Sequence, residues 1–155
     1  MTIIVYDGKT LAIDNAAVKD GIKTPIIKSW TTMAGEVLTG IGNAAQIALM
    51  RDWYTAGASP DAFPASQRDG NPWCDFIVCN SQGLKRYEKT PAAIDHAHFP
   101  CAFGMGKDVA LGAMAAGATA ERAAQIVEHF VPDCGHGINT ITWKESGNET
   151  SKALN

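Results

Sequence analysis

The sequence of 155 residues lacks long apolar segments and polar tracts of low complexity. No apolar run approaches the roughly 20 residues needed to cross a bilayer, so we expect no membrane association. The first residues, MTIIVYDGKT, lack the basic and extended apolar regions of a secretory signal, which favours a cytoplasmic location. Hydrophobic residues make up 46% of the chain and charged residues 19%, as in ordinary globular proteins. We expect one domain at 1–143 and a polar tail at 144–155.

The chain also lacks an excess of positive charge and any CxxC cysteine pair. Thirteen basic and sixteen acidic residues give a net charge of -3, without a Lys/Arg cluster, so nucleic acid is a poor partner. The cysteines, expected to be reduced thiols, are Cys74, Cys79, Cys101 and Cys134. His96 and His98 form an HxH beside Asp95, but no third ligand motif accompanies them. We therefore expect no metal and no cofactor.

Runs of β-branched and aromatic residues predict that four strands precede the first helix. The four strands are a hairpin within 2–14, a strand at 25–30 and a strand at 36–42. Asn43 is a good N-cap, and apolar residues then recur at helical spacing to position 57. A loop is expected at 58–73, because this segment is rich in proline and small polar residues.

The second half of the chain predicts a further set of strands followed by two helices. The expected elements are a hairpin at 74–88, a strand at 99–103, helices at 108–116 and 119–130, and a closing strand at 137–143. In the last helix, Ala123, Ile126, Val127 and Phe130 form one apolar stripe. Two antiparallel sheets packed face to face, with helices on the outer faces, would bury these stripes. The pattern alone leaves another α+β layering open.

Thr2 follows the initiator methionine, and a residue this small permits a methionine aminopeptidase to remove Met1. A threonine hydroxyl becomes a nucleophile when a base takes its proton, and a free α-amine on the same residue can be that base. An α-amine titrates near about 8, so a useful fraction is unprotonated at neutral pH. Threonine at position 2 is common, and this residue alone does not indicate an enzyme.

Asp14 ends a predicted strand, and Lys28 lies among apolar residues of a later one. Taken singly, Asp14 is typical of a turn and Lys28 of a solvated strand position. Beside Thr2, a lysine would disfavour the charged form of the amine, and an aspartate would hold that lysine in place. We predict that Thr2, Asp14 and Lys28 converge in the folded chain.

The spacing of Thr2, Asp14 and Lys28, followed by LTGIGNAA at 38–45, resembles the start of proteasome β subunits and of the bacterial protease HslV. Three later segments resemble the strand, glycine-rich turn, helix and helix junction of bacterial and phage proteasome-like proteins: CAFGMG at 101–106, DVALGAM at 108–114 and AAGATAE at 115–121. The resemblance covers most of the chain, from position 2 to position 143.

This resemblance implies the N-terminal-nucleophile hydrolase fold, an α+β four-layer αββα sandwich of two antiparallel sheets flanked by helices. It also implies a threonine-type peptidase in which Thr2 is the nucleophile and Asp14 and Lys28 support it. Gly42 would donate its backbone N–H to the oxyanion, and Gly40 would lie close to the first substrate pocket. A glycine that leads into a helix suits the donor role, because a substrate can approach its backbone closely.

The same resemblance implies a homo-oligomeric ring that acts on peptides or unfolded proteins, with an ATPase unfoldase as a candidate partner, in a bacterial cell or a phage-infected host. The sequence departs from the pattern at Asn15-Ala16, where many relatives carry a longer polar or basic residue after the aspartate. Met105 stands where active members commonly have serine, and its sulfur cannot donate a hydrogen bond. Ile3 stands where a second threonine is common. Two alternatives stay open: an inactive scaffold or interaction protein of the same fold, and a small-molecule amidase of the same superfamily.

Overall fold

The computed structural model describes residues 1–144, so positions 145–155 of the expected tail lie outside the described part of the chain. The strands form two antiparallel sheets and a separate hairpin. The first sheet consists, in spatial order, of β10 (Cys101–Gly104), β1 (Ile3–Tyr6), β2 (Thr10–Asp14) and β11 (Ile138–Thr142). The second consists of β5 (Ser29–Thr31), β6 (Val37–Gly42), β7 (Cys74–Asn80), β8 (Gly83–Tyr87) and β9 (Ile94–Ala97).

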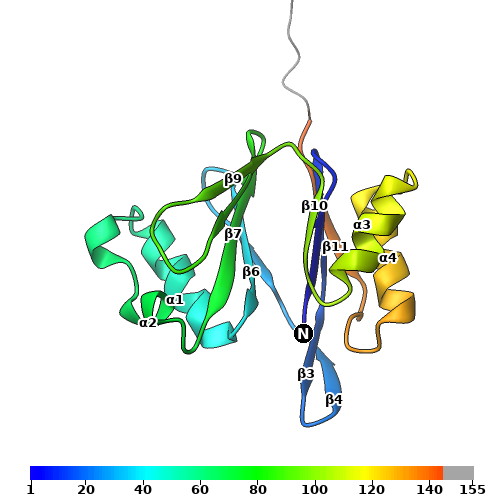
Figure 1. Cartoon of the computed structure of the whole chain (residues 1–155), viewed down its shortest axis with the longest axis horizontal. Coiled ribbons are helices and arrows are strands. Elements are labelled where there is room, and N and C mark those ends of the chain that lie inside the picture. Colours follow the sequence, from blue (N-terminus) through cyan, green and yellow to red (C-terminus); the bar gives the residue numbers. More distant parts are fainter. Residues whose placement is uncertain (145–155) are drawn as a thin grey trace, which may run out of the picture.

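Helices cover the outer face of each sheet (Figure 1). They are α1 (Ala44–Thr55), α2 (Ala65–Asp69), α3 (Lys107–Ala115) and α4 (Ala120–Phe130). The helix α1 packs on β6 and β7 of the second sheet, while α3 and α4 pack on β10, β1 and β2 of the first. No helix within 1–144 is long and apolar enough to cross a membrane. The expected arrangement of two sheets between helices is therefore present.

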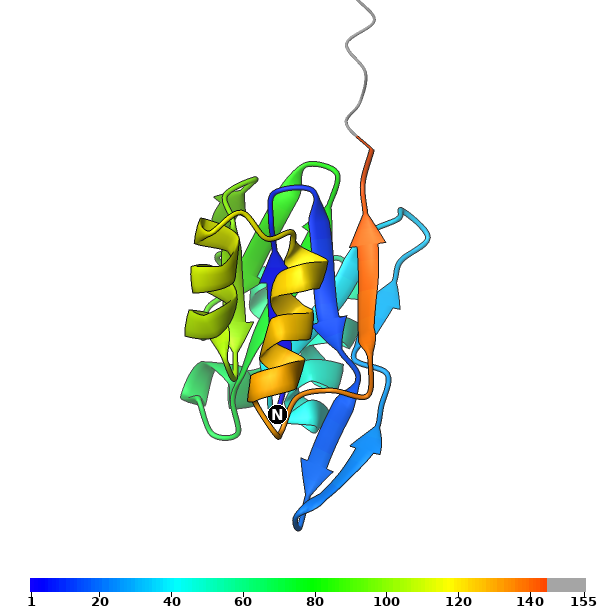
Figure 2. The same ribbon diagram turned by 90° about the vertical axis from the view of Figure 1, so that its right-hand side faces the viewer.

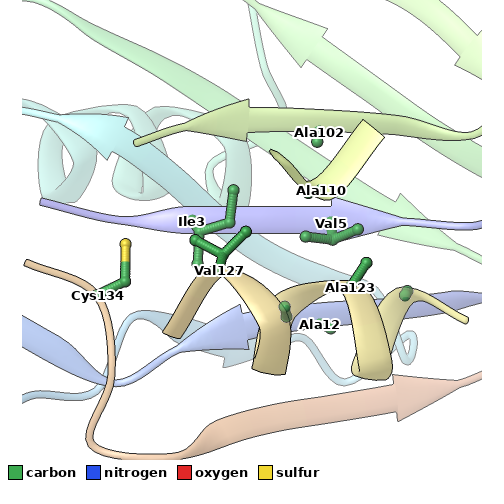
Figure 3. Close-up of a cluster of buried hydrophobic side chains, with 10 residues drawn as sticks. Ile3, Val5, Ala12, Ala102, Ala110, Ala123, Val127 and Cys134 are labelled. Carbon is green, nitrogen blue, oxygen red and sulfur yellow. The ribbon is translucent and has the colours of Figure 1, made fainter. Parts of the chain in front are cut away.

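Alternate residues of β1 enter two different cores, because successive side chains of a strand point to opposite faces. Ile3 and Val5 pack against α4, where Val127 belongs to the same cluster (Figure 3). Ile4 and Tyr6 belong to the cluster between the two sheets. A strand that is buried on both faces has a continuous run of apolar residues, as β1 does with the sequence IIVY. Both ends of β1 are therefore held in fixed positions.

The hairpin of β3 (Ala16–Lys19) and β4 (Ile22–Pro25) was not expected. It projects beyond the first sheet at the end where the N-terminus lies (Figure 2). Asp20 and Gly21 both have positive φ and connect the strands, so the Asp-Gly pair forms the two-residue hairpin turn that such pairs favour. The prediction of one strand at 25–30 is wrong: Pro25 ends β4, and the next strand starts only at Ser29. Six strands, rather than four, precede α1.

Three further expectations need correction. The segment 58–73 is not only a loop, since it contains a 3₁₀ helix (Pro60–Ala62) and α2, whose Gln67 is fully buried. The strand β9 was not expected. Phe130 does not join the buried stripe of α4, because its side chain is 69% exposed. The remaining predicted elements lie where the sequence places them, to within about two or three residues at each end. They are β1, β2, α1, β7, β8, β10, α3, α4 and β11.

Gly104 ends β10 with a φ of +92°, and a Cβ built on it would overlap the carbonyl oxygen of Thr2. We expect Gly104→Ala to lower the free energy of unfolding by about 3 kcal/mol or more, since strain and a backbone clash add. Gly112→Ala is the matched control: apart from its chain neighbours and the adjacent helix backbone, no atom lies within 4 Å of the added Cβ, and alanine in the helix should stabilise by up to about 1 kcal/mol. Urea denaturation measures both. Equal stability of Gly104→Ala and wild type would contradict the close approach.

Candidate functional site

The Asp14 carboxylate is fully buried at the end of β2. Its Oδ1 accepts the backbone N–H of Ile3 at 2.9 Å and the Lys28 ammonium at 2.9 Å. Its Oδ2 accepts the backbone N–H groups of Ala16 at 3.2 Å and Gly135 at 3.3 Å. A buried charge is tolerated when a counter-ion and hydrogen bonds satisfy it, and this carboxylate has both.

The Lys28 side chain is only 9% exposed. Burial lowers the pKa of its ammonium, and the hydrogen bond and charge of Asp14 oppose that shift. The same nitrogen donates to the carbonyl oxygen of Met1 at 2.7 Å. The backbone oxygen of Lys28 accepts the hydroxyl of Thr39, a buried residue of β6, at 2.8 Å. The ammonium therefore lies between Asp14 and the peptide group that joins Met1 to Thr2.

Thr2 is held through its backbone. Its carbonyl oxygen accepts the N–H of Met105 at 2.8 Å, and the following residue, Ile3, donates to Asp14. Thr2 is half-buried and lines a cleft that also contains Lys28. The fold thus brings Thr2, Asp14 and Lys28 to one place, with the lysine in direct contact with the aspartate. Their catalytic roles stay predictions.

The cleft beside Thr2 has a volume of about 290 Å³. Gly40 and Gly42 of β6 line it, together with Ile47 of α1 and residues of β3. Its walls are largely apolar, and Lys28 is the ionisable side chain that lines them within the described residues. The cleft therefore has room for an uncharged side chain next to Thr2.

The register of β6 determines which way its backbone N–H groups point. The N–H of Thr32 donates to the oxygen of Glu36, and alternate residues of an antiparallel strand face the same neighbour. Gly40 lies an even number of residues after Glu36, so its backbone N–H and C=O also face the side of β5. Because β5 begins at the residue opposite Thr39, it does not extend as far as Gly40. The backbone of Gly40 is directed to the cleft rather than to a partner strand. The donor role of Gly42 and the pocket role of Gly40 stay predictions that this direction favours.

Cys134 lies next to the Asp14 cluster and was not expected there. Its side chain is fully buried beside Ile3 (Figure 3). Burial raises the pKa of the thiol to about 11, with the charge of Asp14 adding to the shift and that of Lys28 opposing it. Its Sγ donates to the carbonyl oxygen of Met105 at 3.7 Å. A thiol in this state is a small packing residue and not a nucleophile.

The two histidines of the HxH segment do not come together around a shared point. The ring of His96 packs edge-on against Phe103 with centroids 5.4 Å apart, and burial lowers its pKa. The Nδ1 of His98 lies 3.0 Å from the carbonyl oxygen of Gly8. Within 1–144, no group of three or more His, Cys, Asp and Glu side chains is arranged to hold a metal ion.

Neither a protein-family model nor a curated protein sequence matches this chain. Solved structures do match. BPH of Thiobacillus denitrificans, in complex with epoxomicin, is 16% identical with a TM-score of 0.70, covering 95% of this chain and 100% of that one. HslV of Trypanosoma brucei is 18% identical with a TM-score of 0.65, covering 91% and 98%. The Anbu (Gly-1) mutant of Hyphomicrobium sp. strain MC1 is 12% identical with a TM-score of 0.69, covering 93% and 82%.

Identities this low establish the fold and nothing finer. The likeness extends over more than nine-tenths of this chain in each of the three matches. The chain therefore has the α+β fold of the proteasome-like N-terminal-nucleophile hydrolases, and the fold implied by the sequence resemblance is confirmed.

Asp14→Ala removes the acceptor of three backbone N–H groups and of the Lys28 ammonium. We expect the free energy of unfolding to fall by about 3–5 kcal/mol, because buried donors and a buried cation are left without a partner. Asp52→Ala is the control, since Asp52 is 65% exposed and pairs with Arg51, and it should change stability by less than about 0.5 kcal/mol. Urea denaturation at pH 7 measures both variants. A loss for Asp14→Ala no larger than that for Asp52→Ala would contradict the central place of this carboxylate.

Proposed function

We propose that this chain is a threonine-type N-terminal-nucleophile peptidase, with Thr2 as the nucleophile after removal of Met1. One observation supports the proposal above all: Lys28 bonds at once to the buried Asp14 and to the carbonyl oxygen of Met1. A buried ammonium with a lowered pKa, placed against the peptide group that precedes a threonine, is what activation of a terminal amine requires.

Removal of Met1 takes away the carbonyl to which Lys28 donates and leaves the new amine of Thr2 near the ammonium. The positive charge of Lys28 disfavours protonation of that amine, so more of it is available as a base near neutral pH. Asp14 holds Lys28 in position and balances its charge. The free amine then acts as general base toward the hydroxyl of its own residue.

In the reaction, the Thr2 hydroxyl oxygen attacks the carbonyl carbon of a peptide bond while its proton passes to the Thr2 amine. The backbone N–H of Gly42 would stabilise the oxyanion that forms. Collapse of this intermediate breaks the C–N bond, and the leaving amine takes the proton. The product is an ester on Thr2. Water, deprotonated by the same amine, then cleaves the ester and restores the hydroxyl.

The proposed substrates are peptides or unfolded proteins. A chain lying beside Gly40–Gly42, the part of β6 that β5 does not cover, would place one side chain in the cleft, and the apolar walls suit a side chain without charge. The proposal includes a homo-oligomeric ring in the cytoplasm of a bacterial or phage-infected cell, with an ATPase unfoldase as a candidate partner. Exposed apolar side chains on α3, Val109 and Leu111, at 38% and 40%, are the surface through which we expect copies to associate.

The rival function is a scaffold that keeps the fold without the chemistry. Met105 favours it, because this residue adjoins Thr2 and contributes a backbone N–H but no side-chain donor. In an active enzyme of this design, the amine of Thr2 would rely on Lys28 and Asp14 without a hydroxyl from the 104–106 turn. We therefore expect slow but detectable turnover.

Labelling by epoxomicin tests the nucleophile, since BPH of Thiobacillus denitrificans has been solved with this compound. Protein treated with a methionine aminopeptidase, with loss of Met1 verified by intact mass, should gain one epoxomicin per chain at Thr2. Thr2→Ala should gain none. Lys28→Met should react at least about 100-fold more slowly, because the loss of one member of a catalytic unit removes most of the activity of the whole unit. Thr31→Ala, an exposed threonine of β5, is the control that should react like wild type. Processed wild-type protein that neither reacts nor hydrolyses any member of a broad peptide library is the scaffold.

Assembly is tested by light scattering coupled to size exclusion. The wild-type protein should elute as a multiple of the 16.4 kDa chain. Leu111→Glu places a charge on the exposed face of α3 and should shift the population to smaller species, because a desolvated charge at an interface is costly. Leu49→Glu introduces the same charge on α1 at a similarly exposed site and should leave the assembly unchanged. A wild-type species of 16.4 kDa alone would rule out the ring.

A further inference from the structure

Lys23 connects the β3–β4 hairpin to the segment between α4 and β11. Its ammonium donates to the carbonyl oxygens of Pro132 at 3.0 Å and Cys134 at 3.2 Å. The backbone oxygen of Lys23 also lies 3.3 Å from Nε2 of His136. These contacts join residues more than 100 positions apart in the sequence. Lys23 therefore fixes the position of the segment 132–136 relative to the hairpin.

The carbonyl that Lys23 contacts belongs to the same peptide group as a donor to Asp14. Cys134 supplies the C=O of this group and Gly135 supplies its N–H, and the N–H donates to Asp14 Oδ2 at 3.3 Å. In a trans peptide the C=O and N–H point in opposite directions, so the peptide group lies between the lysine and the carboxylate. A cation on the carbonyl oxygen polarises the group and strengthens the N–H as a donor.

Other contacts hold the segment on both sides of that peptide group, and on the N-terminal side the N–H of Cys134 donates to the carbonyl oxygen of Val131 at 3.0 Å. The N–H of Asn15 donates to the carbonyl oxygens of Gly135 and Gly137, at 3.0 and 3.2 Å. Glu128 Oε1 accepts the N–H of Gly137 at 3.0 Å. The bonds of Asn15 and Glu128 hold the C-terminal side of Gly135, whereas Lys23 donates directly to the C=O of the Cys134–Gly135 peptide group. Both side chains border Gly135, because a Cβ on this glycine would lie 3.1 Å from Glu128 Oε1 and 3.3 Å from Lys23 Nζ.

We propose that Lys23 is a positioning residue for the candidate active site. It orients and polarises the Cys134–Gly135 peptide group, whose N–H donates to Asp14. Asp14 in turn accepts the hydrogen bond that positions Lys28. The lysine does not line the cleft beside Thr2 and does not touch a substrate there. The proposal rests on the peptidase function proposed above. It assigns a role to the unexpected hairpin, whose strand β4 carries Lys23.

Three variants test this role in processed full-length protein. Lys23→Met keeps the aliphatic stem and removes the charge, and Lys23→Arg keeps the charge. Lys19→Met is the control, since Lys19 belongs to the same hairpin but its ammonium makes no hydrogen bond within 1–144. Turnover of a peptide is measured per epoxomicin-reactive site, so that misfolded protein is not counted. We expect kcat of Lys23→Met to fall about 3- to 10-fold with KM unchanged, in keeping with the loss of the charged hydrogen bond to the Cys134 carbonyl.

Hydrogen exchange of the segment 131–137, followed by mass spectrometry, supplies a readout that does not depend on turnover. Exchange should be faster in Lys23→Met than in wild type, because the amide of Gly135 loses a strengthened bond. Lys23→Arg should restore both kcat and protection, and Lys19→Met should match wild type in both.

The outcomes separate the two proposals. Processed wild-type protein without turnover overturns the peptidase function, and the catalytic consequence of Lys23 with it. Active wild-type protein together with a wild-type kcat in Lys23→Met overturns only the role of Lys23. An equal loss of kcat in Lys19→Met and Lys23→Met overturns it as well, since the effect would then belong to the hairpin as a whole.

Discussion

One buried charge determines how the segments around the candidate site are arranged. The Asp14 carboxylate has no exposed surface, and it is tolerated only because four nitrogen donors surround it. The donors come from β1, from the start of β3, from Lys28 and from the segment before β11. If any of these segments moves, the Asp14 carboxylate loses one of its donors, which destabilises the folded state. The shape of the site is thus a consequence of satisfying a single carboxylate.

Much of this arrangement is predictable because it follows from local patterns. The wholly apolar β1 predicts a strand buried on both faces, and Asn43 predicts the start of α1, where its side chain accepts the N–H of Gln46 at 3.0 Å. The proximity of Asp14 to the start of the chain follows from the β1–β2 hairpin, since Ile4 pairs with Ile13 and the next residue on each strand is Ile3 and Asp14. In a hairpin, the first residue of one strand and the last residue of the other lie side by side.

The remaining features depend on contacts that no local pattern specifies. Gly135 reaches Asp14 across 121 residues of sequence, so only the folded sheet brings the two together. The helix α2 forms in a segment with loop composition because Gln67, within it, donates to the carbonyl oxygens of Cys74 and Glu88. The β3–β4 hairpin is different: the sequence shows the Asp-Gly turn that closes it, but β4 is short and exposed and gives only a weak strand signal.

The position of Met1 at the cleft has a practical consequence for handling the protein. Most chain termini can carry an added peptide without harm, because they lie free at the surface. Here Met1 bonds to Lys28 and lines the cleft, so a purification tag fused ahead of it would run directly through the space proposed for substrate. The other end of the first sheet is remote from this cleft: Trp143, just after β11, pairs with Lys9 at the opposite turn (Figure 1). Fluorophores and surface attachments therefore belong on the side of the molecule where Trp143 and Lys9 lie, away from the cleft.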